Sequence, residues 1–177
     1  MTIKAIGLGQ SDAAIRVYVK NRPNLIQFQT LRDTLPLQAG QIAQINAEAG
    51  NGWRKVFNVY AKWLYQLAPS CLALKSADTW QQFRDQTLLQ NHSQTALLFS
   101  EPDVTDPDAA LHIIAGKTHA KELAANEQLD INLIWLNDEF AISTTQRIIV
   151  CPYFDYRQLN NAKIDILCEL VHTHINL

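Results

Sequence analysis

The sequence has little charge of either sign and few cysteines, and each shortage excludes a class of protein. Only 18% of the 177 residues are charged, and the formal net charge is −2. A chain without a large electrostatic field is not expected to bind nucleic acid mainly by neutralising phosphates, although a local basic face is compatible with these numbers. The three cysteines, Cys71, Cys151 and Cys168, form no C-x-x-C pair. This pattern predicts neither a disulfide framework nor a zinc site.

Long apolar runs are also lacking. The longest, such as 97–99 and 148–150, fall far short of the roughly 20 residues that cross a bilayer. No charged start precedes an apolar core at the N-terminus, so no signal peptide is expected. Together with the unpaired cysteines, these absences predict a cytoplasmic protein that does not enter the membrane. No repeat, low-complexity tract or linker divides the chain, and residues 1–177 are expected to form a single domain.

The clearest helical pattern lies between residues 53 and 67. Apolar side chains recur there at the spacing of one helix face, and polar residues occupy the other side: the apolar positions are Trp53, Val56, Phe57, Tyr60, Leu64 and Leu67. Further helices are expected after Pro36, from Asp78, over 118–128 and from Leu159 to the C-terminus. Gly7-Leu8-Gly9 is expected to be a flexible turn.

Short apolar runs between these helices have the composition of buried strands. They cover 14–19, 95–99, 111–115, 131–136 and 147–151. A further run at 140–143 is expected to form a hairpin with 131–136 around Asn137-Asp138. Strands that alternate with helices predict an α/β fold of three layers. We expect a mainly parallel or mixed sheet of four to six strands with helices on both faces.

Polar chemistry is densest from Cys151 to Asn161, where a buried strand runs into the last helix. Loops at the carboxyl ends of strands are the usual ligand sites of open α/β sheets. This loop supplies phenols, a carboxylate, a guanidinium and amides, a set suited to a planar polar ligand. The candidate ligand-binding residues are Cys151, Tyr153, Asp155, Tyr156, Arg157 and Asn160. Asp155 is an alternative candidate for the cap of the last helix.

Gly116-Lys117-Thr118 stands between an expected strand and an expected helix, the setting of a phosphate-binding loop. That loop needs a second glycine five residues upstream, and Leu111 occupies the position instead. We therefore expect an ordinary glycine turn with Thr118 as N-cap, in which Lys117 and the first helical amides can still meet an anion. His119 would follow in the first helical turn, where it can contact a ligand.

The start of the 53–67 helix is a secondary candidate site. Asn51, Trp53 and Arg54 combine flexible backbone, an aromatic ring and a cation, which could hold an anion or a base. The alternative is a glycine helix stop followed by a helix whose Trp53 lies in the core. His172 and His174 lack spaced partner ligands, so no metal site and no cofactor are expected.

Two segments resemble the uracil-DNA glycosylase superfamily, in which one strand ends in glycine before a helix and a later strand ends in a His-Pro-Ser loop. Residues 111–116 with 119–121 are similar to the first part, and residues 148–153 are similar to the second. The resemblance implies a glycosylase-like fold and a nucleobase-like ligand. Cys151 and Tyr153 stand where the family has its catalytic histidine and its serine, so the glycosylase reaction is not implied. The whole chain also resembles an uncharacterised bacterial protein family, which implies no activity.

Three functions remain open from the sequence. The first is a domain that binds a small planar polar or nucleobase-like ligand at the loops around 116–119 and 151–161, with nucleic acid as a subordinate version. The second is a protein-interaction or homo-oligomeric assembly module, in which the four tryptophans serve a partner surface. The third is a small hydrolase or transferase that uses Cys151 or Asp155 with His119 as base. Whether the protein is an enzyme is left open.

Overall fold

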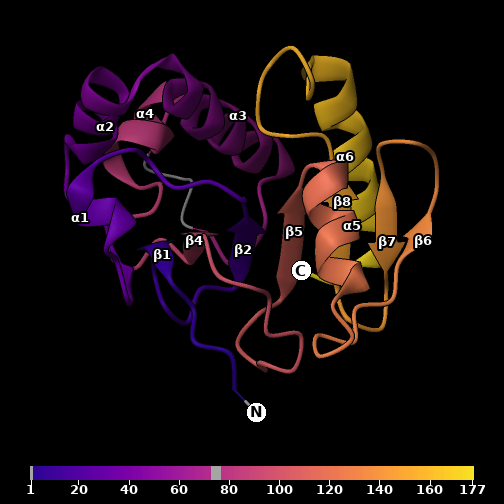
Figure 1. Cartoon of the computed structure of the whole chain (residues 1–177). Coiled ribbons are helices and arrows are strands. Elements are labelled where there is room, and N and C mark those ends of the chain that lie inside the picture. Colours follow the sequence, from indigo (N-terminus) through magenta and orange to yellow (C-terminus); the bar gives the residue numbers. More distant parts are fainter. Residues whose placement is uncertain (1, 73–76) are drawn as a thin grey trace.

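The computed structural model describes residues 2–72 and 77–177, and an eight-stranded sheet runs through it in the order β3-β1-β4-β2-β5-β8-β7-β6 (Figure 1). The strands are β1 (Gly7–Gly9), β2 (Ile15–Tyr18), β3 (Thr34–Leu35), β4 (Thr95–Leu98), β5 (Leu111–Ala115), β6 (Ile134–Trp135), β7 (Ala141–Ser143) and β8 (Ile148–Cys151). The helices are α1 (Ile26–Gln29), α2 (Gln41–Ala49), α3 (Asn51–Leu67), α4 (Trp80–Gln86), α5 (Lys117–Ala125) and α6 (Asn161–His174).

The centre of the sheet is parallel and its flanks are not. Strands β4, β2, β5 and β8 run parallel to one another. Strand β1 is antiparallel to β4 and parallel to β3, and β7 is antiparallel to both β8 and β6. The predicted α/β class and mixed sheet are confirmed. The expected four to six strands were too few, because β1 and β3 were not predicted: β3 has only two residues, and β1 has three, of which two are glycines, so neither leaves a periodic pattern.

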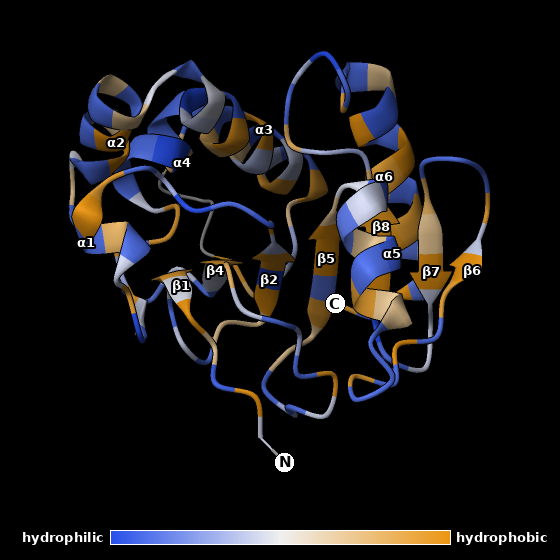
Figure 2. Cartoon of the chain, in the orientation of Figure 1, coloured by the Kyte–Doolittle hydropathy of each residue, from blue (hydrophilic) through white to orange (hydrophobic). Residues whose placement is uncertain are grey.

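Helices cover both faces of the sheet. The larger apolar cluster joins one face to α2, α3, α4 and α6, and the smaller cluster joins the other face to α5. Successive side chains of the central strands point alternately into the larger and the smaller cluster, as expected for strands that are buried on both faces. Figure 2 shows these strands as mainly hydrophobic segments, while the loop between β8 and α6 is mainly hydrophilic.

Gly7-Leu8-Gly9 is strand β1, and the expected flexible turn was wrong. It lies between β3 and β4, and Leu8 is buried. A β-carbon on Gly7 would overlap the carbonyl oxygen of Leu97, so glycine is needed for the close approach of the two backbones. A three-residue strand with two glycines has no strand propensity, and only its neighbours determine its structure.

Three helix starts differ from the sequence expectation by a few residues. Thr79, not Asp78, caps α4 and accepts a hydrogen bond from the Gln82 amide. Gly116 precedes α5 in place of the expected Thr118. Asn160, rather than Asp155, caps α6 by accepting from the Lys163 amide at 3.0 Å.

The order of the parallel strands creates a crevice at the carboxyl ends of β2 and β5. The chain leaves β2 toward β4 on one side, and later leaves β5 toward β8 on the other side. The helices of these two connections lie on opposite faces of the sheet, with α3 on one and α5 on the other. Such a reversal is the switch point at which open α/β sheets bind their ligands.

Candidate functional site

Two adjoining hollows lie at this edge of the sheet, with volumes of about 300 and 440 Å³. Both are lined by Gly116, Lys117, Tyr153 and Gln158, which therefore form the boundary between them. We call the two hollows together the carboxyl-edge groove. The smaller hollow extends to Lys20, Asn21, Ala115, Thr118 and His119. The larger extends to Asp138, Glu139, Pro152, Arg157 and Lys163.

Strand pairing brings the two sides of the groove together. Ala115 and Cys151 are partners in the parallel ladder of β5 and β8, so both loops leave the sheet at the same level. The ladder continues one residue further, because the Gly116 amide donates to the Cys151 carbonyl oxygen at 2.8 Å. Two loops that lie about 35 positions apart in the sequence thereby share one wall.

Lys117 is the cation of the groove that is left available to a ligand. Lys20 is paired with Glu122 at 2.8 Å, Lys163 with Glu139 at 2.7 Å, and Arg157 with Asp155 at 2.7 Å. Among the described residues no such partner is found for the Lys117 ammonium. It occupies the first position of α5, where the helix dipole adds positive potential.

His119 lines the smaller hollow from the first turn of α5. Burial lowers the pKa of its imidazole below the usual range. The nearby Glu122 carboxylate raises this pKa and the Lys20 ammonium lowers it, but burial is the largest effect. The ring is therefore neutral at physiological pH. Its Nε2 atom is enclosed and has no hydrogen-bond partner in the described structure. A neutral imidazole can offer one donor or one acceptor to a bound molecule.

Asp155 fixes the loop and does not line either hollow. Its carboxylate accepts hydrogen bonds from the backbone amide and the guanidinium of Arg157, and the Lys55 ammonium lies 3.7 Å away. The hydrogen bond from the Arg157 guanidinium is the main reason that the pKa of Asp155 falls to about 2. A carboxylate so stabilised is a weak base, which removes support for a reaction that proceeds through Asp155.

Cys151 lies in the core with no exposed surface. Its side chain belongs to the apolar cluster on the α3 and α6 face, and burial raises the pKa of its thiol. Catalysis by cysteine needs an accessible thiolate. The structure thus leaves the proposed thiol chemistry without a reactive group, and Cys151 contributes only its carbonyl oxygen to the junction.

The other candidates of this loop are divided between the groove and its surroundings. Tyr153 is half-buried and lines both hollows. Tyr156 is exposed, and the Lys55 ammonium lies 5.5 Å from the centre of its ring. Asn160 caps α6. Of the eight primary candidates, Lys117, His119, Tyr153 and Arg157 line the groove.

The secondary candidates lie elsewhere. Trp53 is buried and packs edge-on against Phe99. Arg54 lines a separate hollow of about 390 Å³ between α2, α3 and α4, while Asn51 is exposed at the start of α3. The alternative interpretation, a glycine stop before a helix whose Trp53 belongs to the core, fits this arrangement.

The sequence interpretation missed part of the groove. The missed residues are Lys20, Asn21, Asp138, Glu139, Gln158 and Lys163. Lys20 and Asn21 directly follow a segment with clear strand composition, and this position was the available signal. Asp138 and Glu139 come from the β6–β7 hairpin turn, and only the strand order brings them near β8.

A wider hollow of about 480 Å³ lies between α3, α4 and α6. It is lined by helix side chains such as Lys62, Tyr65 and Trp80, away from the carboxyl ends of the strands. The connections after β2, β5 and β8 and the β6–β7 turn all converge on the carboxyl-edge groove, whereas no strand end lines this wider hollow. We therefore prefer the groove as the candidate site, although each of its two hollows is smaller than this one.

Within residues 2–72 and 77–177, no group of three or more His, Cys, Asp or Glu side chains could hold a metal ion. No helix of the described part is both long enough and apolar enough to cross a membrane. No curated protein and no solved structure matches the chain significantly. One family model matches residues 6–172, which is nearly the whole sequence. The chain therefore belongs to DUF6942, a family of unknown function.

Proposed function

We propose that the protein binds a small, planar, polar ligand in the carboxyl-edge groove. The observation that carries this proposal is the convergence of the loops after β2, β5 and β8 on two adjoining hollows at the switch point of the sheet. Pockets of this kind combine an apolar surface with a few polar groups that fix orientation. Here the Tyr153 ring supplies the apolar surface. The polar groups come from Lys117, Gln158 and Asn21.

A nucleobase-like ligand fits this chemistry. Such a ring presents both donors and acceptors along its edge, and the Gln158 amide can match either kind. The two segments that resemble the loops of uracil-DNA glycosylases are the ones that line the groove, which supports the same class of ligand. Binding without catalysis is favoured, because the described groove holds no exposed thiol and the Asp155 carboxylate is committed to Arg157.

The interaction-module alternative receives less support from the tryptophans. Trp53 and Trp63 are buried. Trp80 and Trp135 are half-buried and lie under cations, with Lys62 at 5.0 Å from the Trp80 ring centre and Lys121 at 5.4 Å from that of Trp135. These four side chains therefore do not form a shared apolar surface.

The test is a titration of the full chain with free nucleobases, nucleosides and mononucleotides, in which binding is monitored by NMR through the backbone amide chemical shifts. We expect shifts at 116–119 and 153–158 for at least one class. Lys117→Ala should weaken that ligand about tenfold, the loss of roughly 1.4 kcal/mol expected for one charge-assisted contact. Lys121→Ala, one turn further along α5, is the matched control and should bind as the wild type does. Shifts confined to other surfaces, or no binding by any member, would overturn the proposal.

A further inference from the structure

A buried polar cluster lies outside the groove, on the sheet face that α5 covers. Arg16 and His112 are partners on the adjacent strands β2 and β5, and both are enclosed, with 2% and 0% of their surface exposed. Tyr18 follows two positions after Arg16 on the same face, and its hydroxyl lies 2.7 Å from Nδ1 of His112. Buried groups of this kind are costly unless every donor is satisfied.

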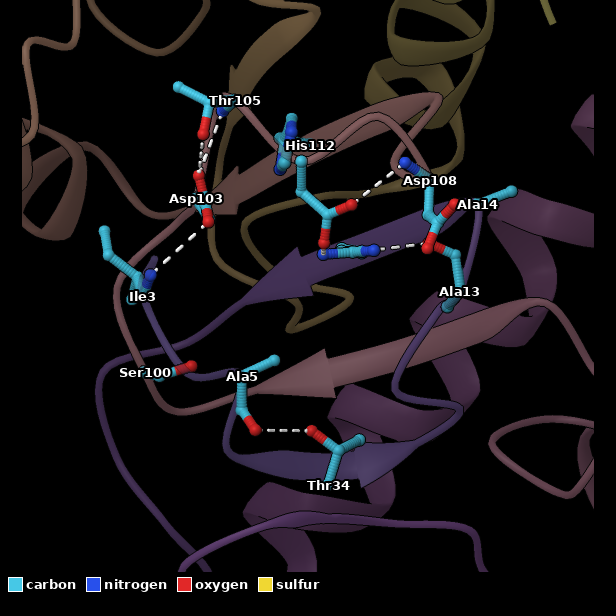
Figure 3. Close-up of polar contacts among 12 residues, drawn as sticks. Ile3, Ala5, Ala13, Ala14, Thr34, Ser100, Asp103, Thr105, Asp108 and His112 are labelled. Atoms are coloured by element: carbon cyan, nitrogen blue, oxygen red, sulfur yellow. Dashed lines mark hydrogen bonds and ion pairs between the residues drawn. The ribbon is translucent and has the colours of Figure 1, made fainter. Parts of the chain in front are cut away.

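The loop between β4 and β5 covers this cluster through Asp106. One carboxylate oxygen of Asp106 accepts from the Arg16 Nη1 at 2.8 Å, and its other oxygen accepts from the Asp108 amide at 2.9 Å. Because the second Asp106 oxygen is bonded to the Asp108 amide, the ion pair between Asp106 and Arg16 has one hydrogen bond and not the two of a bidentate pair. Figure 3 shows the loop residues Asp103, Thr105 and Asp108 arranged around His112.

Two enclosed nitrogens are consequently left without a partner, Nη2 of Arg16 and Nε2 of His112. Both are donors. Arginine is always protonated, and a neutral His112 that accepts the Tyr18 hydroxyl at Nδ1 carries its proton on Nε2. The remaining guanidinium nitrogen, Nε, donates to the Ala13 carbonyl oxygen at 2.9 Å. The cluster thus has three donors, Nη1, Nη2 and Nε2–H, of which only Nη1 is paired, with one oxygen atom of Asp106.

We propose that Arg16 and His112 form a binding site for a carboxylate or phosphate group, and that Asp106 occupies this site from within the chain as a displaceable cover. A guanidinium fork matches an anion that presents two oxygens side by side. An external oxyanion can satisfy Nη1 and Nη2 together and accept from His112, which Asp106 does not do. The Asp106 side chain is 28% exposed, so the pair can be reached from solvent at that edge.

The inference does not depend on the function of the groove. Arg16 and Lys117 lie toward opposite ends of the parallel strands, because Arg16 is near the start of β2 and Lys117, the first residue of α5, follows the end of β5. A groove variant such as Lys117→Ala should therefore leave oxyanion binding at Arg16 unchanged. Each proposal can fail while the other holds.

The experiment compares Asp106→Asn with Asp108→Asn in the full chain. Both variants remove one negative charge from the same turn, and no side-chain contact of Asp108 is found among the described residues. Sodium phosphate and sodium acetate are titrated separately at constant ionic strength, with binding followed by the His112 imidazole resonances and by the melting temperature. The relative response to the two anions distinguishes a phosphate site from a carboxylate site.

We expect Asp106→Asn to bind one of these anions about tenfold more tightly than Asp108→Asn does, the gain expected if the internal cover occupies the site about nine-tenths of the time. Arg16→Lys in the Asp106→Asn background should abolish the gain, because an ammonium lacks the fork. Equal responses of the two Asn variants, or His112 resonances that do not move, would overturn the proposal. Should the Arg16 variant fail to fold, the first comparison still decides the outcome.

Discussion

The Gly116 amide donates to the Cys151 carbonyl oxygen at 2.8 Å, and this bond joins the two loops that border the carboxyl-edge groove. It extends the β5–β8 ladder by one residue beyond the last paired side chains. Gly116 holds a φ of +105° there, immediately before α5 begins. The groove therefore depends on a backbone conformation that residues with a β-carbon rarely adopt.

Gly116→Ala should destabilise the protein by about 1–2 kcal/mol, because alanine is strained at this positive φ although its β-carbon would have room. Urea denaturation measures the change. Gly52→Ala is the matched control, since Gly52 lies in the first turn of α3 with open space around it and without a positive φ. There alanine should be neutral or stabilise by up to about 1 kcal/mol. A Gly116 variant as stable as the control would contradict the role given to this turn.

Composition and periodicity predicted those helices and strands whose own residues carry a clear hydrophobic pattern. Helix α3 was predicted almost to its ends, because nine of its residues are buried along one side and leave a strong apolar stripe. The four parallel strands were predicted because each is a short run buried on both faces. Strand β1 was missed, since two glycines carry no pattern and its pairing with β4 depends on residues nearly 90 positions away.

The candidate site was predicted in part for the same reason. Loops after apolar strands can be found from the sequence, so residues 116–119 and 151–161 were identified. Which side chains of those loops face the groove is set by local hydrogen bonds, and Asp155 turns instead toward Arg157 and Lys55. Contributions from β2 and from the β6–β7 turn depend on strand order, which periodicity does not encode.

Alkylation should distinguish the three cysteines. Cys71 is exposed, whereas Cys151 and Cys168 are buried and burial raises the pKa of both thiols. In the native protein iodoacetamide should modify Cys71 first, and Cys151 at least about a hundredfold more slowly, because attack on Cys151 requires the core to open. Peptide mass spectrometry measures the rates, and in denaturant all three should react alike. Rapid native labelling of Cys151 would reopen the possibility of thiol chemistry.

The ion pairs of Asp155 should make part of the stability depend on pH in the acid range. The folded-state pKa of about 2 lies below the unfolded value of about 3.9. The stabilisation is therefore complete above pH 4 and is lost as the pH falls toward 2. Asp155→Asn should be less stable than the wild type at neutral pH, and this difference should shrink across that window. Asp138→Asn, at an exposed carboxylate across the groove, should show no such trend in urea midpoints.

His112 should produce a second pH dependence in a separate window. Burial is the main cause that lowers its pKa to about 4, with Arg16 and Arg147 acting in the same direction. An unfolded histidine has a pKa of about 6.5, so between these values the unfolded chain binds more protons than the folded chain. Stability is then complete above pH 6.5 and falls by about 1.4 kcal/mol per pH unit as the pH decreases toward 4.

The comparison of His112→Gln with the wild type isolates this effect from other titrating groups. The variant should lose the His112 part of the slope between pH 6.5 and 4, while any contribution from His119 remains in both proteins. His172→Gln, at an exposed position near the end of α6, should retain the wild-type slope. Urea unfolding at closely spaced pH values gives the three slopes. If His112→Gln and His172→Gln behave alike, His112 is not held neutral in the folded protein, and its Nε2 does not have the donor role assigned to it beside Arg16.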